Sequence, residues 1–410
     1  MKRVVQKYGG TSVGKPERIL AVAARVARQF REGLTQNAIV VSAMSGETNR
    51  LVDLMRQVNS QASARAYDMT VAAGEQVSVG LMAAALESQG IAAVPLLGHQ
   101  LGIMTDDSHS RARIQSIRRD RIEAIWRTGG IPVVAGFQGV TSDNAITTLG
   151  RGGSDTSAVA LAAALETDFC EINTDVDGMY SADPRTVKQA RHIAKMDYET
   201  ALEMAALGSK VLHPRCVELA AKYRLPLIVR SSFDPDEAKR TWIMELTPQE
   251  ALESPVVTGV SATKDVTRVT VEGFDPGTPI LRDLFTRIAE AGINVDVIVH
   301  DRLRQGEQQS VGFTIPTADL NDTLKAIELV KQAGGCAGVV VKAESGLAKV
   351  STVGVGMRSH SGVASRFFSV LAKAEVPVLM VTTSEIKISC VIPEPLADLA
   401  SQVLHAEFIG

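Results

Sequence analysis

The chain has 410 residues, of which 45% are hydrophobic and 22% charged, with a formal net charge of −3. This length allows two to four domains with large cores, and the composition excludes a disordered or fibrous protein. Because the charge is nearly balanced, no basic field favours nucleic acid or an anionic membrane, and we expect neither as a partner.

The cysteines and the hydropathy of the chain further narrow the class of protein to which it can belong. The four cysteines, at positions 170, 216, 336 and 390, are too far apart for a zinc pattern or a disulfide framework. Reduced thiols in a cytoplasmic protein are therefore expected. The first residues resemble the start of a strand rather than a signal peptide, and no uncharged apolar run of about 18 residues predicts a membrane-spanning helix.

The first predicted element is a strand at residues 4–8, followed by Gly9-Gly10-Thr11-Ser12 and a helix that begins at Pro16. A strand, a glycine turn and a helix together can hold a phosphate, because the backbone N–H groups at a helix start attract anions. The stretch is not a Walker A motif, since Lys7 precedes the glycines. Lys7 fits either a phosphate-binding role or an ordinary solvated lysine at a strand end.

Strands are predicted next at residues 38–41, 91–97 and 131–137, with helices at 51–58 and 66–88. Alternating strands and helices predict a mostly parallel sheet, whose ligands gather at the carboxyl ends of the strands. The polar turn from Ser42 to Asn49 follows one such end. Glu75 lies among apolar residues of the helix at 66–88, so it either faces solvent or lines the crevice, where it could hold a substrate ammonium group.

A glycine-rich turn, residues 150–155 (Gly-Arg-Gly-Gly-Ser-Asp), leads into an alanine-rich helix. Ser154 is predicted to cap this helix, and the free N–H groups behind it make an anion site. Arg151 adds a planar fork suited to a carboxylate or a phosphate. A tight turn before a well-capped helix is the simpler interpretation, but it does not account for Arg151 and Asp155 in the turn.

The loop at residues 174–185 follows a strand at 168–173 and is rich in turn residues and carboxylates. Its Asp-x-Asp-Gly lacks the rest of a calcium loop. The loop suits the ribose, base and Mg²⁺ of a nucleotide, or it is a surface turn. Helices at 198–207 and 214–223 and a strand at 226–230 follow, and the polar segment at 234–253 is predicted to be a linker.

The rest of the chain repeats itself. Residues 266–274 resemble 347–355, and residues 284–295 resemble 367–378. Each copy follows a βαββαβ order of the ferredoxin-like type. Two tandem copies can pair their sheets edge to edge and bury ligands between them, or they can form a duplicated packing domain without a ligand.

Taken in order, these motifs resemble those of the aspartokinase family. The resemblance is carried by residues 7–13, 73–76, 136–139, 147–155, 174–185 and 208–214, and by two C-terminal units similar to ACT domains. It implies an α/β amino-acid kinase fold (three-layer αβα, mostly parallel sheet) at residues 1–245. A linker at 246–262 and two βαββαβ ACT domains at 263–342 and 343–410 would follow.

The resemblance also implies an activity: phosphorylation of the β-carboxylate of L-aspartate by ATP and Mg²⁺, giving 4-phospho-L-aspartate. This would be the first step of lysine, threonine and methionine biosynthesis, with feedback inhibition by lysine and/or threonine. It implies a homodimer, or an α2β2 tetramer with a separately made ACT-region subunit. The alternatives are another amino-acid kinase and a catalytically weak amino-acid sensor.

By this resemblance, catalysis falls to Lys7, which neutralises charge on the transferring phosphoryl group, and to Asp155, which orients Lys7. Arg151 would hold a substrate carboxylate and Glu75 the α-ammonium group. No general base is needed, because the attacking carboxylate is already ionised at pH 7. The other substrate-binding residues are Ser42, Gly46, Glu47, Thr48, Asn49, Arg50, Gly152, Gly153 and Ser154. ATP is assigned to Lys7, Tyr8, Gly9, Gly10, Ser42, Ser154, Thr174, Asp175, Tyr180, Ser181, Ala182, Asp183, Pro184, Arg185 and Lys210, and no side chain is predicted as a direct metal ligand.

Effector binding is expected in the loops of the two ACT-like units. The residues assigned to it are Asp275, Thr278, Asn294, Asp296, Met357, Ser359, His360, Ser361, Gly362, Val363, Thr383, Ser384 and Glu385. The first loop, residues 275–279, departs from the family pattern, and Pro279 removes an N–H donor near the helix start. The second has Ser361 where proline is usual, so the sequence leaves open whether both sites bind effectors.

Overall fold

The computed structural model describes residues 2–208, 211–234, 239–247, 249–250, 255–275, 279–302, 309–332 and 339–410. The chain forms two compact units. The N-terminal unit comprises residues 1–180, 192–206 and 210–252, and the C-terminal unit comprises 181–191, 207–209 and 253–410. The predicted boundary near residue 245 is close to this division, but residues 181–191, predicted within the first domain, belong to the C-terminal unit.

The N-terminal unit is built on an eight-stranded sheet with the order β12-β14-β13-β9-β1-β2-β6-β3. Its strands are β1 (Arg3–Tyr8), β2 (Gln36–Val41), β3 (Ala93–Leu96), β6 (Ile131–Ala135), β9 (Phe169–Thr174), β12 (Lys195–Met196), β13 (Leu227–Ser231) and β14 (Thr241–Ile243). All adjacent pairs are parallel except β13 with β14. The chain passes from one half of the sheet to the other around β1, and ligands of open α/β sheets bind at such a point.

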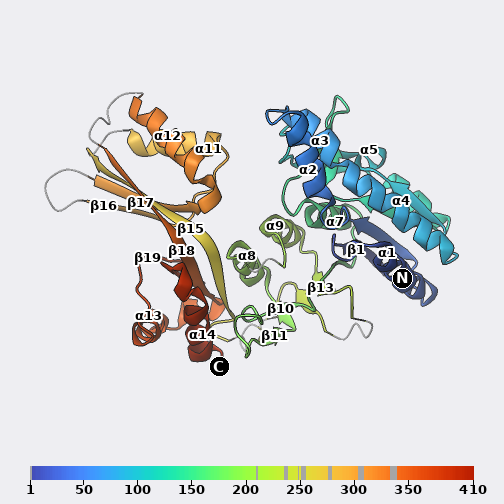
Figure 1. Cartoon of the computed structure of the whole chain (residues 1–410). Coiled ribbons are helices and arrows are strands. Elements are labelled where there is room, and N and C mark those ends of the chain that lie inside the picture. Colours follow the sequence, from blue (N-terminus) through green and yellow to red (C-terminus); the bar gives the residue numbers. More distant parts are fainter. Residues whose placement is uncertain are drawn as a thin grey trace. The chain divides into compact units, whose positions relative to one another are not determined.

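The N-terminal unit also contains a smaller sheet, a two-stranded pair and the helices α1 to α9 (Figure 1). The small sheet has the order β5-β4-β7-β8, with β4 (Ile103–Thr105), β5 (Ile114–Ile117), β7 (Gln138–Val140) and β8 (Ile146–Thr148). The helices are α1 (Pro16–Arg31), α2 (Glu47–Val58), α3 (Ala64–Val71), α4 (Ala73–Ser88), α5 (Gly98–Leu101), α6 (Asp120–Arg127), α7 (Gly153–Ala164), α8 (Tyr198–Ala206) and α9 (Pro214–Tyr223). Strands β10 (Met179–Tyr180) and β11 (His192–Ile193) form a short hairpin pair.

Helices α1 and α7 show how the sequence sets the layers. In α1 the buried residues recur at helical spacing, Ile19, Val22, Ala23 and Val26, and they join α4 residues in one core cluster over the sheet. Helix α7 is buried from Gly153 to Ala162, which fits its alanine-rich composition because small side chains let a helix approach its neighbours closely. A buried α7 places its first turn inside the unit rather than at its surface.

The predicted helix at 66–88 is divided into α3 and α4, which meet at Ala72. Among the described helices, the run Ala64–Ser88 is long and apolar enough to cross a membrane by length and composition alone, but 56% of its most apolar window is buried inside the structure. It also contains Asp68 and Glu75, both buried and hydrogen-bonded within this unit. These properties are typical of a core helix.

The C-terminal unit has one six-stranded antiparallel sheet in the order β16-β17-β15-β18-β20-β19. The strands are β15 (Gly259–Phe274), β16 (Ile298–Arg302), β17 (Gln309–Pro316), β18 (Val340–Val353), β19 (Met380–Thr383) and β20 (Lys387–Pro393). The helices are α11 (Ile280–Glu290), α12 (Leu320–Gln332), α13 (Val363–Lys373) and α14 (Ala397–Phe408), with short 3-10 turns η1 (Thr317–Asp319), η2 (Val355–Ser359) and η3 (Glu394–Leu396). The predicted duplication is therefore present, with its two sheets joined edge to edge.

The two repeats share strands rather than following one another as separate domains. Residues 266–274 of β15 pair with β17, whereas residues 259–263 pair with 349–353 of β18. The second repeat ends in α14 and takes its fourth strand from residues 259–263, of which the sequence analysis placed 259–262 in the linker. Strand β14 also lies inside the predicted linker at 234–253. Both corrections have one cause, since the backbone of an open sheet edge gains hydrogen bonds from any extended segment within reach.

Each repeat has its own core cluster. The cluster of the second repeat includes Ala182 and Val187, which come from the segment at 181–191. The Ser181 hydroxyl lies 2.9 Å from Nε2 of His405 in α14. This segment therefore completes the hydrophobic core of the C-terminal unit.

Candidate active site

The N-terminal unit contains a cavity of about 1140 Å³ at the carboxyl ends of β1, β2 and β8. It is lined by twelve predicted site residues: Lys7, Gly10, Ser42, Gly46, Thr48, Asn49, Glu75, Arg151, Gly152, Gly153, Ser154 and Asp155. Tyr67, Ser110 and Thr148 also line it, and the sequence analysis did not single them out. Stretches far apart in the sequence thus meet at one cavity.

A buried ion pair forms one wall of the cavity. Nζ of Lys7, the penultimate residue of β1, lies 2.6 Å from Oδ1 of Asp155 in the first turn of α7, and their side chains are 11% and 12% exposed. A carboxylate in the first turn is favoured by the helix dipole, and the pairing compensates both charges for lost hydration. The ammonium group of Lys7 is thereby fixed at the cavity wall instead of moving freely in solvent.

The turn before α7 is shaped by two glycines in the left-handed region, Gly150 at φ 77° and Gly152 at φ 66°. A Cβ on Gly152 would lie 2.2 Å from Cβ of His213, so no other residue fits there without displacement. Gly152 is also the residue that precedes the helix, and Ser154 lies inside the first turn. The prediction that Ser154 caps α7 is therefore wrong, because the left-handed glycine turn already ends the preceding loop two residues earlier.

Glu75 faces the cavity, one of the two orientations that its sequence context allowed. Its Oε1 accepts a hydrogen bond from the Ala43 N–H at 3.0 Å, and its buried Oε2 has no hydrogen-bond partner among the described residues. Burial raises the pKa of Glu75 from 4.5 to about 7, although the N–H of Ala43 acts in the opposite direction. A buried carboxylate oxygen without a partner at a cavity wall is suited to a cationic ligand.

The turn after β2 contributes Ser42 and Gly46 to the lining, and the first turn of α2 contributes Thr48 and Asn49. Glu47 and Arg50, predicted beside them, pair instead with each other at 2.6 Å and do not line the cavity. The hydrogen bond from Arg50 lowers the pKa of Glu47. In this arrangement the carboxylate and the guanidinium satisfy one another at the rim.

The residues predicted for ATP differ in where they lie relative to the cavity. Lys7, Gly10, Ser42 and Ser154 line the cavity. Gly9 donates its N–H to Asn173 O at 3.2 Å, and Thr174 ends the adjacent strand β9 with Asp175 directly after it. The Tyr8 side chain is wholly buried in the core, so only its backbone can reach a ligand.

The loop predicted for ATP at 174–185 is divided between the two units. Tyr180, in the N-terminal unit, donates its hydroxyl to Asp177 Oδ2 at 3.0 Å. Ser181 and Ala182 are 2% and 5% exposed in the C-terminal unit, so their side chains are not open to a nucleotide, contrary to the prediction. Asp183 and Arg185 form an ion pair of 2.7 Å beside Pro184. Lys210 lies outside the described residues.

The predicted effector residues lie at three places in the C-terminal unit. Asp275 follows β15, and Asn294 and Asp296 precede β16, with Asp296 ion-paired to Lys349 of β18. Met357, Ser359 and His360 lie in or after η2, followed by Ser361, Gly362 at φ 94° and the buried Val363 at the start of α13. Thr383, Ser384 and Glu385 connect β19 to β20. Thr278 lies outside the described residues.

None of the described cysteines lines the cavity. Cys170, Cys216 and Cys390 are free and buried, as predicted, and burial raises the pKa of each thiol. In the described part of the chain, no group of three or more His, Cys, Asp or Glu side chains could hold a metal ion. The charged side chains that line the cavity are three cationic ones, Lys7, Arg56 and Arg151, and three anionic ones, Asp53, Glu75 and Asp155.

Comparison with known proteins places this chain in a family. The model of the amino acid kinase family matches residues 2–231, and a model of the ACT domain matches residues 350–408. The aspartokinase of Pseudomonas aeruginosa is 47% identical over 410 residues, which cover 100% of this chain and 98% of that protein. The chain belongs to the aspartokinase family. The aspartate kinase of Stutzerimonas stutzeri is 46% identical over 409 residues, covering 100% of this chain and 97% of the other.

Solved aspartokinase structures agree with this assignment. Escherichia coli aspartokinase III in complex with aspartate and ADP has a TM-score of 0.81 and 26% identity, and the alignment covers 100% of both chains. The structure of the same enzyme in complex with lysine and aspartate shares the fold, with a TM-score of 0.74 and 24% identity. The predicted family, the predicted kinase class and the predicted fold class of an amino-acid kinase with ACT repeats are confirmed.

Proposed function

We propose that this aspartokinase-family protein transfers the γ-phosphoryl group of ATP to the β-carboxylate of L-aspartate, giving 4-phospho-L-aspartate and ADP. One observation carries the proposal: a single cavity is lined by the Lys7–Asp155 ion pair, by Arg151 and by the partnerless oxygen of Glu75. These groups match the reacting phosphoryl group and the carboxylate and ammonium groups of an amino acid. The E. coli relative bound to aspartate and ADP supports the same pair of ligands.

The reaction needs positive charge rather than a base. The attacking β-carboxylate is already ionised at pH 7, so no proton has to be removed. The barrier comes from bringing this anion to a polyphosphate and from charge that spreads over the transferring phosphoryl oxygens. Lys7 supplies a cation at the cavity wall, and Asp155 holds it there at 2.6 Å, so little reorganisation is needed in the transition state.

Aspartate is recognised through its charges. Arg151 follows the left-handed Gly150, and its guanidinium can bind a carboxylate with two parallel hydrogen bonds. Glu75 binds the α-ammonium group through Oε2, which otherwise stays buried without a partner. Ser42, Thr48 and Asn49 add short polar side chains around the same space.

The nucleotide extends from the cavity along the carboxyl ends of β1 and β9. Gly10 has room there only as glycine, since a Cβ would lie 2.9 Å from the Ala43 carbonyl oxygen. Thr174, Asp175 and Tyr180 are the predicted contacts to the ribose and base, and they stay predictions. Mg²⁺ would be bound chiefly by the phosphates of the nucleotide.

The C-terminal unit is the proposed regulatory part. We expect lysine and/or threonine to bind at the loops before α11 and α13, with the glycine turn at Gly362 exposing backbone N–H groups for an effector carboxylate. Binding inhibits only if it favours a less active conformation by differential affinity. The cytoplasmic location, the place at the start of lysine, threonine and methionine biosynthesis, and the homodimer or α2β2 tetramer remain part of this proposal.

One assay tests the activity. The protein is incubated with MgATP, hydroxylamine and either L-aspartate or L-glutamate, and the acyl hydroxamate is measured. Hydroxamate from aspartate alone is expected. Product from glutamate instead indicates another amino-acid kinase, and absence of product together with tight lysine or threonine binding indicates an amino-acid sensor.

A further inference from the structure

A second arginine, Arg215 of α9, binds the backbone of the turn that carries Arg151. Arg215 is the second residue of α9 and is half-buried. Its Nη1 donates a hydrogen bond to the Leu149 carbonyl oxygen at 2.8 Å, and its Nη2 donates one to the Ala112 carbonyl oxygen at 2.7 Å. Leu149 comes two residues before Arg151, whereas Arg215 does not line the cavity. Arg215 can therefore act on a ligand only through the backbone that it holds.

The two carbonyl groups belong to two segments that lie side by side. The Ala112 N–H donates to the Thr148 carbonyl oxygen at 2.9 Å, and the Ser110 carbonyl oxygen lies 3.0 Å from the position of a Cβ on Gly150. Residues 110–112 thus pack directly against residues 148–150. The planar guanidinium offers two donors in a fixed geometry, so it bridges these segments with two charge-assisted hydrogen bonds.

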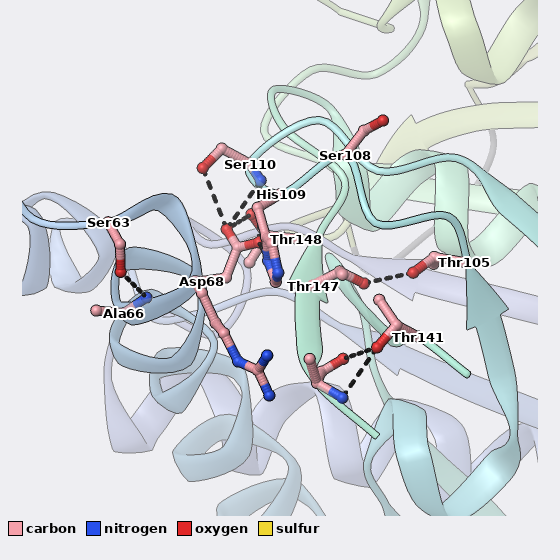
Figure 2. A network of polar contacts seen from close by, with 12 residues as sticks. Ser63, Ala66, Asp68, Thr105, Ser108, His109, Ser110, Thr141, Thr147 and Thr148 are labelled. Carbon is pink, nitrogen blue, oxygen red and sulfur yellow. Dashed lines mark hydrogen bonds and ion pairs between the residues drawn. The ribbon is translucent and has the colours of Figure 1, made fainter. Parts of the chain in front are cut away.

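A buried carboxylate, Asp68 of α3, holds the same pair of segments through other atoms (Figure 2). Its Oδ1 accepts the Thr148 hydroxyl at 2.6 Å, and its Oδ2 accepts the Ser110 N–H at 2.9 Å and lies 2.8 Å from Nδ1 of His109. The stretch before Arg151 is therefore bound by a carboxylate on α3 and by a guanidinium on α9. A displacement of either segment would break a hydrogen bond to a buried or half-buried ionisable group, which is costly.

Helix α9 also contacts the residue that follows Arg151. His213, the residue that caps α9, packs so closely on Gly152 that a Cβ on the glycine would lie 2.2 Å from Cβ of His213. Nδ1 of His213 accepts the N–H of Arg215 at 3.3 Å, which links these two residues to each other. The start of α9 therefore contacts Leu149 before Arg151 and Gly152 after it. Arg151 itself is exposed at the cavity, so the place of its guanidinium follows that of this backbone.

We propose that Arg215 is a positioning residue for substrate binding, which holds Arg151 where its guanidinium can bind a carboxylate group of the amino-acid substrate. The inference rests on the proposed function and extends it. Arg215 does not touch the ligand: it ties two backbone segments together and thereby limits the movement of the turn. The Lys7–Asp155 pair is held separately, because Asp155 belongs to α7, which is buried from Gly153 to Ala162. Loss of the Arg215 contacts should therefore weaken the binding of aspartate more than that of ATP.

The test compares Arg215→Met, Arg215→Lys and the control Arg121→Met. Methionine keeps an unbranched apolar stem but has no donor, and lysine keeps the charge but not the planar pair of donors. Arg121 of α6 is a matched control, since its Nη1 also donates to a backbone carbonyl oxygen, that of Gln100 at 2.9 Å, and it does not line the cavity. The KM for aspartate and the KM for ATP are measured for each variant, and urea unfolding checks its stability.

Arg215→Met should raise the KM for aspartate roughly tenfold and Arg215→Lys roughly threefold or more, while the KM for ATP changes less than about twofold. Arg121→Met should leave both values close to those of the unsubstituted protein. The decisive measurement is a double-mutant cycle on kcat/KM for aspartate. Because Arg215 acts through Arg151, Arg215→Met should lower kcat/KM roughly tenfold in the unsubstituted protein but less than about twofold in Arg151→Met. If Arg215→Met does not fold, Arg215→Lys in the same cycle decides the question.

Two results would overturn the inference while the proposed function stands. In the first, the Arg215 substitutions lower kcat/KM for aspartate by the same factor with and without the Arg151 side chain, which is the mark of a structural role alone. In the second, the KM for aspartate rises no more than the KM for ATP, or no more than it does in Arg121→Met. Failure of the unsubstituted protein to phosphorylate aspartate would instead refute the proposed function, and the inference with it.

Discussion

The substitution Glu75→Gln tests two effects of the Glu75 carboxylate separately: its cost to the stability of the fold and its contribution to substrate binding. Burial raises the pKa of Glu75 from 4.5 to about 7. Each pKa unit corresponds to about 1.36 kcal/mol, so ionising this side chain costs roughly 3 kcal/mol more in the folded than in the unfolded chain. Below about pH 4.5 the carboxyl is protonated in both states and this cost is absent. As the pH rises through 7, the cost develops in full and lowers the stability.

Glutamine keeps the acceptor for the Ala43 N–H but cannot ionise. We therefore expect the free energy of unfolding of Glu75→Gln, relative to the unsubstituted protein, to rise by about 2 to 3 kcal/mol between pH 5 and pH 8. Urea unfolding followed by tryptophan fluorescence measures this, since both of the chain's 2 tryptophans, Trp126 and Trp242, lie in the N-terminal unit. Glu87→Gln, on the exposed side of the same helix, is the control and should show no such difference.

The same substitution should cost substrate affinity. Without a charge to pair with the ammonium group, the KM for aspartate should rise roughly 10- to 100-fold while the KM for ATP stays the same. In the unsubstituted protein the KM for aspartate should fall about tenfold from pH 6 to pH 8, as Glu75 ionises. Equal pH dependence of stability in Glu75→Gln and the unsubstituted protein, or a pH-independent KM, would show that Glu75 is not the group described here.

Three further substitutions test the rest of the site. Lys7→Ala should lower kcat roughly 10³-fold in the hydroxamate assay, because the fixed cation at the phosphoryl group is lost, and a near-normal kcat would remove Lys7 from the mechanism. Arg151→Lys keeps the positive charge but loses the planar guanidinium, so calorimetric titration should show that aspartate binds roughly tenfold more weakly or worse. Unchanged aspartate affinity would refute a contact made by two parallel hydrogen bonds. Gly152→Ala should lower the free energy of unfolding of the N-terminal unit, measured in urea, by more than about 2 kcal/mol, because the new Cβ would collide with His213. The control is Gly129→Ala, at a similar φ of 75° with open space around it, which should cost only about 1 kcal/mol. Equal losses in the two glycine variants would contradict the packing described for Gly152.

Local patterns and the family resemblance together were sufficient to predict many of the residues that line the cavity. The turn at 150–155 and the strand ending at Lys7 each have a spacing that indicates an anion site, and the parallel sheet brings both to one cavity. The sequence could not show that Ser181 and Ala182 belong to another core, because that depends on which distant helix offers them a hydrophobic partner. For the same reason it missed the strand at 259–263.

Asp68 illustrates a different limit. In the sequence it is one carboxylate in an ordinary amphipathic helix, where solvent exposure is the usual outcome. Its partners come from a turn about forty residues away and from a strand farther along the chain, so no spacing rule connects them. Only the three-dimensional structure shows that this carboxylate is buried and that its partners line the cavity.

The cavity is proposed to bind two anions, the nucleotide and aspartate, yet three buried carboxylates lie around it. The partners of these carboxylates explain why they do not repel both ligands. Asp155 is paired with Lys7, and Asp68 accepts several hydrogen bonds, so the negative charge of each is compensated within the protein. Of the three, Glu75 is the one with a buried oxygen that has neither a hydrogen bond nor an ion pair among the described residues, since Oδ1 of Asp155 is paired with Lys7. A ligand that brings a cation to this point gains that contact, and one with two carboxylates and no cation does not. Discrimination between amino acids and other dicarboxylates therefore follows from which of the three charges the protein leaves uncompensated.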